Sequence, residues 1–221
     1  MSYEKDTWDY LISLGYTEEG TAGIMGNIHA ESANSPINLQ NSANRKLGMT
    51  DTQYTKAVDD GTYENFIYDS AGYGICQWTY WSRKKSLLQF AKKRSVSIGN
   101  LFMQIDFLEK ELKQYGLYKK LHNSKDIREA TKIFLVQFEK PASVIGKTEE
   151  QIEEIVDTRY QYAQTIYNKY HSTLKDDLNT LVRFNVISSP DYWELHANDL
   201  QYLPNLYHNM ASVCLQFEEN N

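Results

Sequence analysis

One stretch decides the fold of this sequence: Gly23-Ile24-Met25-Gly26-Asn27-Ile28-His29-Ala30-Glu31-Ser32. It carries the signals of a short helix, because Thr17 can cap its start and Pro36 lies just beyond its last turn. At helical spacing Glu31 shares a stripe with Ile24 and Ile28, and that stripe is too apolar to face water. A carboxyl group at the end of such a stripe is partly desolvated. Desolvation raises the pKa of a carboxyl group, as a general acid at neutral pH requires.

Two glycines stand inside this helix. Gly23 and Gly26 each cost about 1 kcal/mol relative to alanine in a helix interior. Their presence indicates that another segment approaches this backbone closely. From the helix alone a second interpretation stays open, in which Glu31 is a solvated acid and the glycines only permit tight helix packing.

A second motif follows: Asp69-Ser70-Ala71-Gly72-Tyr73-Gly74-Ile75-Cys76-Gln77-Trp78. Together the two motifs resemble the phage tail lysozyme family within the lysozyme-like superfamily. There a G-x-x-G-N-x-x-A-E-S helix bears the catalytic acid, and a G-Y-G-x-x-Q-W turn lines the sugar cleft. The resemblance covers roughly residues 17–170, with further matches at residues 138–142 and near Arg159-Tyr160.

The resemblance implies a mainly α fold with a lysozyme-like (goose-type or transglycosylase-like) catalytic domain. It implies a peptidoglycan glycosidase that cleaves the β-1,4 bond between N-acetylmuramic acid and N-acetylglucosamine, with Glu31 as proton donor. A lytic transglycosylase with the same acid, giving 1,6-anhydro products, is one alternative. A non-catalytic protein that binds cell walls or belongs to the phage tail is another. We expect either an endolysin, made in the host cytoplasm without a signal peptide and acting on the cell wall, or a virion-associated lysin.

Asp69 is the candidate for a second catalytic carboxylate, because it is matched in the family's D-S-x-G-Y-G pattern. Such a group lies about 5 Å from the acid in retaining glycosidases and about 6.5–9.5 Å away in inverting ones. The alternative role for Asp69 is an Asx turn, in which its carboxylate accepts a hydrogen bond from the backbone two residues further on. Glu64, Asp59 and Asp60 are further candidates without a distinguishing feature.

The expected substrate-binding residues are Gly72, Tyr73, Gly74, Gln77 and Trp78. The two glycines permit a sharp turn and the close approach of a bulky ligand. Gln77 can both donate to and accept from the amide of an N-acetylated sugar. Tyr73 and Trp78 offer flat rings for stacking on a sugar, although Trp78 also suits a core position.

Four nearby residues are left out of this set. Tyr80 and Trp81 are expected to pack in the core. Glu139 is matched in the family but is interpreted as structural, pairing with an arginine. His29 lies two residues before Glu31 and so points to a different face of the helix.

A different enzyme class, a cysteine peptidase with Cys76 as nucleophile and His29 or His122 as base, is a minor alternative.

Composition limits the partners and cofactors. The 221 residues carry a net charge of −6 without a basic run, so we expect no nucleic-acid partner. No stretch approaches the roughly 20 apolar residues of a membrane span, so we expect no membrane insertion. Cys76 and Cys214 lie far apart and give no zinc-ligand spacing, and neither a metal nor a cofactor is expected.

Helical signals cover most of the chain. The expected helices of the first domain span residues 6–14, 17–32, 50–61, 82–93, 100–115, 124–138 and 148–170. Ser124 is expected to cap one of them, and Thr148 and Gln151 form a capping box for the last. A short strand pair within residues 32–70 is the only β structure expected.

The domain boundary is expected near residue 171, giving a catalytic domain over 1–171 and a small three-helix domain over 172–221. Residues 186–193 resemble the small helical module found at the C-terminus of some clostridial phage cell-wall hydrolases. About fifty residues form only a thin core, so we expect this module to dimerise or to dock on the first domain. Our hypothesis for its role is cell-wall binding or homo-oligomer formation. Its aromatic candidates for binding are Tyr192, Trp193 and Tyr202.

Overall fold

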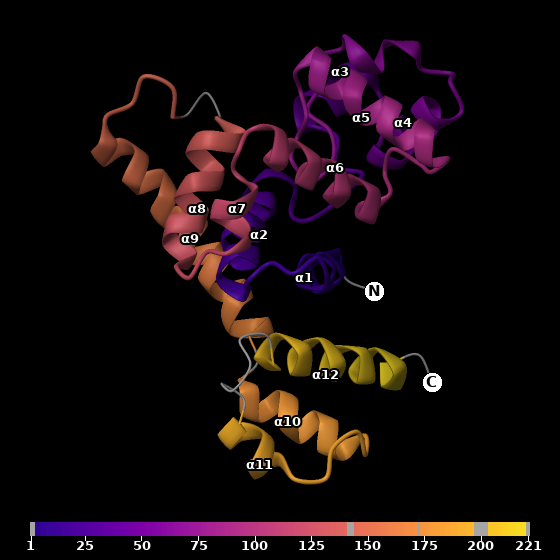
Figure 1. Ribbon diagram of the computed structural model, residues 1–221. Helices are drawn as coiled ribbons and strands as arrows, with labels where there is room; N and C mark the ends of the chain where they lie inside the picture. The colour runs from indigo at the N-terminus through magenta and orange to yellow at the C-terminus, as the bar shows by residue number, and fades with distance from the viewer. Residues whose placement is uncertain (1–2, 141–143, 172, 197–202, 220–221) are drawn as a thin grey trace. The chain divides into compact units, whose positions relative to one another are not determined.

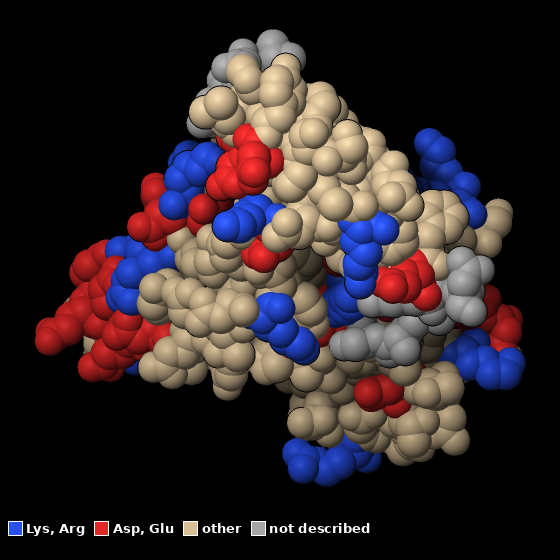
Figure 2. All heavy atoms as spheres, turned by 90° about the horizontal axis from the view of Figure 1, so that it is seen from below, with Lys and Arg blue, Asp and Glu red and all other residues tan. Residues whose placement is uncertain are grey.

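The computed structural model describes residues 3–140, 144–171, 173–196 and 203–219. The described residues are mainly α-helical, as predicted, and contain two isolated β-bridges but no strand. The chain divides into two compact units, Met1–Asn168 and Lys169–Asn221. None of the described helices is both long enough and apolar enough to cross a membrane. On the face seen in Figure 2, basic and acidic side chains are interspersed without a large continuous basic area.

Helix α2 (Glu18–Ser32) lies at the centre of the first unit. It packs against α1 (Tyr3–Ser13), α7 (Tyr118–His122), α8 (Ile127–Ile133) and the π-helix η2 (Phe134–Glu139), as Figure 1 shows. The hydroxyl of Thr17 accepts a hydrogen bond from the Gly20 amide, which confirms the predicted cap. The helix ends where Ala33 turns left-handed, with φ of 50°.

The two glycines of α2 make the close contacts that the sequence indicates. A Cβ atom on Gly23 would lie 2.5 Å from the Cβ of Ala130 in α8. A Cβ atom on Gly26 would lie 2.6 Å from the backbone oxygen of Arg159 in α9 (Glu149–Tyr170). Both distances are shorter than van der Waals contact, so only glycine lets these helices approach α2 as closely as they do.

The segment between α2 and the glycine-rich turn is more helical than predicted. It contains α3 (Asn41–Leu47), α4 (Asp51–Asp59) and the 3₁₀ helix η1 (Glu64–Ile67), where one helix was expected. In Figure 1 this segment gathers with α5 (Trp81–Arg94) at one end of the unit. Helix α6 (Leu101–Gln114) joins the two parts of the unit, because it contacts α5 as well as α1 and α7. The expected strand pair within 32–70 is instead a single bridge from Leu39 to Tyr73 in the turn.

The segment predicted as one helix over 124–138 is divided in the structure. Asp126, not Ser124, caps α8 by accepting a hydrogen bond from the Glu129 amide. Helix α8 then continues directly as the wider π-helix η2, which ends at Glu139. The capping box of α9 is confirmed, because Thr148 and Gln151 exchange hydrogen bonds between side chain and backbone.

The second unit contains three helices among its described residues: α10 (Leu174–Arg183), α11 (Pro190–His196) and α12 (Leu203–Glu219). Its core consists of Leu178, Leu181, Tyr207 and Ala211, with Trp193 packed partly buried against them. Of the predicted aromatic candidates, Tyr192 is exposed, and Tyr202 lies outside the described residues.

Candidate active site

Glu31 occupies the last turn of α2, with 24% of its side chain exposed. Its carboxylate accepts a hydrogen bond of 2.6 Å from Nη2 of Arg159. The carboxyl group is therefore partly buried, as the apolar stripe predicted. It also has a cationic partner, which the sequence argument did not include.

Arg159 projects from α9 and connects three groups. Besides Glu31, its Nη1 donates to the backbone oxygen of Asn27 over 3.2 Å. The same nitrogen lies 3.3 Å from Oε2 of Glu139. The side chain of Arg159 is only 10% exposed, so one buried guanidinium lies between two carboxyl groups.

Glu139 is the last residue of η2, and only 5% of its side chain is exposed. Apart from the ion pair with Arg159, its two carboxyl oxygens have no hydrogen-bond partner among the described residues. Burial raises the pKa of Glu139 from 4.5 to about 8, against the opposing effect of the Arg159 charge, and the charge of Glu31 raises it further. Burial therefore favours the protonated form of Glu139.

The glycine-rich turn packs against the end of α2. The hydroxyl of Ser32, next to Glu31, donates to the backbone oxygen of Ile75 at the tip of the turn over 3.0 Å. Cys76 follows and is buried. The two motifs of the sequence therefore meet in space beside the Glu31 carboxylate.

Asp69 does not belong to this group of charges. Its side chain is 4% exposed and forms a 2.5 Å ion pair with Lys84, and it accepts hydrogen bonds from the Tyr54 hydroxyl and the Ala71 amide. The structure thus corrects the prediction of Asp69 as a second catalytic carboxylate, because the residue forms the Asx turn that was its alternative role and has little access to a substrate.

The structure also corrects the expected stacking residues. Tyr73 and Trp78 are both 0% exposed, so neither ring has a free face for a sugar. The Tyr73 hydroxyl lies 2.7 Å from the Thr55 hydroxyl, and the Trp78 indole donates to Glu111 over 2.8 Å. Both rings pack in the core that supports the turn.

Gln77 and the turn glycines have structural contacts as well. The Gln77 amide nitrogen donates to both oxygens of Asn38 and to the Gly74 carbonyl. A Cβ atom on Gly72 would lie 2.7 Å from Oε1 of Gln77, and Gly74 has a positive φ of 76°. The tight path of the turn explains both glycines without a ligand.

The cysteine peptidase alternative finds no support in the geometry. Burial raises the pKa of the Cys76 thiol well above its ordinary value, which disfavours the nucleophilic thiolate. His29 Nδ1 lies 3.3 Å from the Asn34 amide, and His122 Nδ1 lies 2.8 Å from the Asn123 side chain. Neither histidine has a described contact with Cys76.

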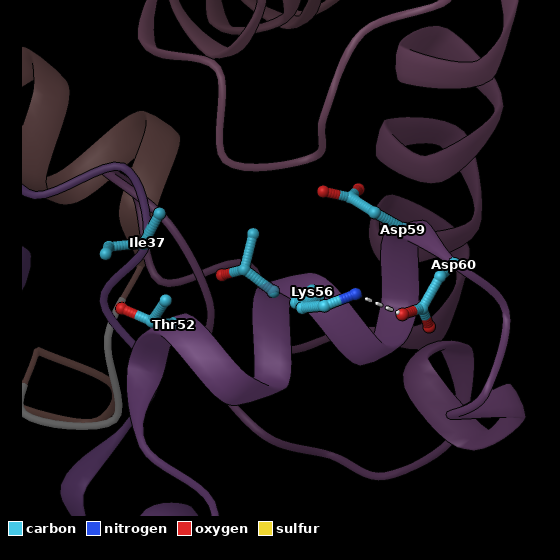
Figure 3. A pocket seen from close by; sticks show the side chains of 6 residues that line it. Ile37, Thr52, Lys56, Asp59 and Asp60 are labelled. Carbon is cyan, nitrogen blue, oxygen red and sulfur yellow. Dashed lines mark hydrogen bonds and ion pairs between the residues drawn. The ribbon is translucent and has the colours of Figure 1, made fainter.

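A hollow of about 410 Å³ on α4 is a second candidate for a functional site. Figure 3 shows Lys56 paired with Asp60, and Asp59 close to Asp60 at the same end of the hollow, opposite Ile37 and Thr52. The Asp59 carboxylate accepts hydrogen bonds from the Ser97 hydroxyl and the Ile98 amide. These charges are satisfied within the protein, so the hollow lacks a group ready for chemistry. Among the described residues, no three His, Cys, Asp or Glu side chains gather as a metal site.

Sequence reasoning predicted the partly buried position of Glu31 at the end of its helix. It did not predict that Arg159 contacts both Glu31 and Glu139. Arg159 stood within the resemblance to a known family, and Glu139 was interpreted as the structural partner of an arginine. No local pattern reveals that one guanidinium faces both carboxyl groups, because that contact joins α2, η2 and α9.

Comparison with known proteins gives a match to one family model. A family model described as phage tail lysozyme matches residues 2–170, which include Glu31, Glu139 and Arg159. Searches of curated proteins and of solved structures give no match.

Proposed function

The chain belongs to the phage tail lysozyme family, and from this premise we propose that it cleaves the β-1,4 bond between N-acetylmuramic acid and N-acetylglucosamine with Glu31 as general acid. Membership in the family gives the chain a peptidoglycan-lytic role of the glycosidase type. The observation that carries the finer proposal is the position of Glu31, half-buried at the end of α2 beside Arg159 and the glycine-rich turn.

The chemistry sets one condition on Glu31. A glycosidic bond breaks through an oxocarbenium-like state once the leaving oxygen is protonated, so the donor must carry a proton. A guanidinium at 2.6 Å, however, favours the ionised form of a carboxyl group. A proton donor paired with an arginine therefore needs a second carboxylate with which the guanidinium can pair instead.

Glu139 is that group. Glu31, Arg159 and Glu139 together hold two carboxyl groups for one fixed positive charge, so the cluster is neutral when it carries one proton. With the proton on Glu139, Arg159 pairs with Glu31. With the proton on Glu31, Arg159 pairs with Glu139, and Glu31 is ready to donate.

The bond-breaking step then balances as follows. Glu31 gives its proton to the leaving oxygen of N-acetylglucosamine while the bond from that oxygen to the anomeric carbon of N-acetylmuramic acid breaks. Arg159 stabilises the Glu31 carboxylate that forms. Water adds to the anomeric carbon, and the proton it releases restores the charge state of the cluster.

Lytic transglycosylation is the second candidate, and the position of Asp69 favours it. Because Asp69 is bound to Lys84 and buried, the leading candidate for a second carboxylate has little access to a water that attacks the sugar. A transglycosylase needs only the single acid: after Glu31 protonates the leaving oxygen, the 6-hydroxyl of the muramic acid attacks its own anomeric carbon, returns its proton to the Glu31 carboxylate and closes a 1,6-anhydro ring.

For the second unit we propose cell-wall binding or self-association, within an endolysin or a virion-associated lysin. Several exposed apolar side chains support this proposal: Tyr192, Leu195 and Phe217 are 55%, 77% and 66% exposed within that unit. Co-sedimentation with purified cell walls and analytical ultracentrifugation of the full chain test the two roles.

The test of the catalytic proposal is clearance of a purified cell-wall suspension by the wild-type protein and by Glu31→Gln. Mass spectrometry of the released muropeptides distinguishes the two reactions, because hydrolysis leaves reducing ends and transglycosylation leaves 1,6-anhydro ends. If Glu31→Gln clears walls as fast as the wild type, the assignment of the acid is wrong.

A further inference from the structure

Three aromatic side chains next to the glycine-rich turn are exposed, although two of them were expected to pack. Tyr68, Tyr80 and Trp81 are 67%, 63% and 46% exposed. The rings of Tyr68 and Trp81 lie 6.4 Å apart at an interplanar angle of 25°, and those of Tyr80 and Trp81 lie 6.1 Å apart. We call this group the aromatic shelf. Clustered exposed rings of this kind mark binding surfaces more often than isolated ones do.

The shelf borders a hollow of about 400 Å³. Its lining consists of the three rings and two hydroxyl residues, Ser70 and Thr79. None of the five is aliphatic or charged. Flat rings beside hydroxyl groups suit a pyranose, which has C–H bonds on its faces and hydroxyl groups around its edge.

A buried ion pair fixes the geometry of the shelf. Asp69 directly follows Tyr68, and Lys84 lies one helical turn after Trp81 in α5. Lys84 is 0% exposed and donates to Asp69 over 2.5 Å and to the Ala71 carbonyl over 2.7 Å. This pair joins the two segments that present the rings. A buried ion pair is weak evidence for stability but can impose a specific arrangement, and a prearranged surface binds with less loss of entropy.

The shelf is linked to the catalytic acid through the glycine-rich turn. Ser70 and Thr79 flank the turn whose tip, Ile75, contacts Ser32 next to Glu31. Ile75 lies five positions after Ser70, so the two residues are at most about 18 Å apart. A glycan strand of a few sugars is long enough to span that distance.

We propose that the aromatic shelf is a carbohydrate-binding subsite for the N-acetylated glycan strand of peptidoglycan. This proposal rests on the proposed function, because it takes its ligand from the strand that Glu31 would cleave. It assigns sugar stacking to Tyr68, Tyr80 and Trp81 in place of the buried Tyr73 and Trp78.

The test measures binding separately from cleavage. In a Glu31→Gln background, retention on purified insoluble peptidoglycan and affinity for soluble chitin oligosaccharides are compared for Tyr80→Ala, Trp81→Ala and Trp81→Phe. Phe102→Ala is the matched control, because Phe102 is also 46% exposed but lies outside the shelf. Circular dichroism and thermal melts show that each variant is folded.

Each alanine variant of the shelf should bind about three- to tenfold more weakly, which is the range expected for one aromatic contact. Trp81→Phe should recover most of the loss, and Phe102→Ala should bind normally. With Glu31 intact, the shelf variants should raise KM and leave kcat nearly unchanged. Unchanged affinity in both alanine variants overturns the proposal. So does a change of oligomeric state in them, because the shelf would then be a protein interface.

The outcome is independent of the test of the proposed function. Activity of Glu31→Gln would refute the catalytic assignment, whereas the binding measurements would still show whether the shelf contacts a glycan.

Discussion

Arg159 donates a hydrogen bond of 2.6 Å to Glu31, although the two residues lie 128 positions apart in the sequence. The contact depends on the close approach of α9 to α2, which the absence of a side chain at Gly26 permits. The position of the proposed catalytic acid therefore depends on helix packing as well as on the helix that carries it.

Glu31→Gln should lower the rate of wall clearance by about 10²- to 10⁴-fold, which is the usual contribution of a positioned general acid. Glutamine keeps an oxygen that can accept from Arg159, so the melting temperature should change little. The rate is measured as turbidity loss of purified walls. Glu19→Gln, an acid in the first turn of the same helix, is the control and should remain active.

Arg159→Met should unfold more easily, by about 1–3 kcal/mol, because it leaves the partly buried Glu31 carboxylate without its cation and the Asn27 backbone oxygen without that donor. Urea unfolding measures the effect. Arg159→Lys should recover part of the stability but little of the activity, since one ammonium does not span two carboxyl groups as the planar guanidinium does. Equal activity of Arg159→Lys and the wild type would contradict the bridging role.

The helices were predictable where the chain carries its own signals. Thr17 before α2, and Thr148 with Gln151 before α9, are caps that act within a few residues of the chain. The π-helix η2 was not predictable, because α-helix and π-helix share the same apolar spacing over one turn.

The site was only partly predictable for a related reason. Glu31 stood in a helix whose periodicity defines a buried face, but the turn that follows has no such periodicity. Sequence reasoning therefore did not foresee which aromatic residues are buried, since Trp78 is fully buried and Trp81 is exposed. The ion pair between Asp69 and Lys84 was likewise not predictable, since a lysine is normally expected to face solvent and Lys84 is fully buried.

Gly26→Ala should destabilise the first unit by about 1–3 kcal/mol despite the higher helix propensity of alanine. The new Cβ atom would lie 2.6 Å from the Arg159 backbone oxygen and 2.7 Å from the Ala163 Cβ. Helix α9 must then move away from α2, and activity should fall as Arg159 shifts. Adding Ala163→Gly should restore part of the stability, as thermal melts of the double variant would show. No recovery would mean that the backbone contact alone sets the spacing.

Cys76→Ser should keep the activity of the wild type within about twofold, because the thiol is buried and its raised pKa keeps it protonated. Wall clearance before and after treatment of the native wild-type protein with iodoacetamide provides a second measurement. Loss of activity in both experiments would revive the cysteine peptidase alternative.

Glu139→Gln should change how stability depends on pH. Burial raises the pKa of Glu139 from 4.5 to about 8, so the folded protein keeps a proton that the unfolded chain releases. The stability that this carboxyl group contributes is complete below pH 4.5 and is lost as the pH rises towards 8. The difference in melting temperature between Glu139→Gln and the wild type should therefore grow from pH 5 to pH 8 in favour of the variant. It should level off above that pH.

Activity should move in the opposite direction to stability in the same variant. Without a carboxyl group at 139 to compete for Arg159, the guanidinium stays on Glu31, and activity at pH 7 should fall even though the protein is more stable. In the wild type kcat/KM should change near pH 8, where Glu139 loses its proton, and Glu139→Gln should lack this step. Glu129→Gln, at an exposed position in α8, should keep the wild-type profile. A purely structural Glu139 would lower activity without removing the step, so a step that persists in Glu139→Gln would refute proton sharing in the cluster.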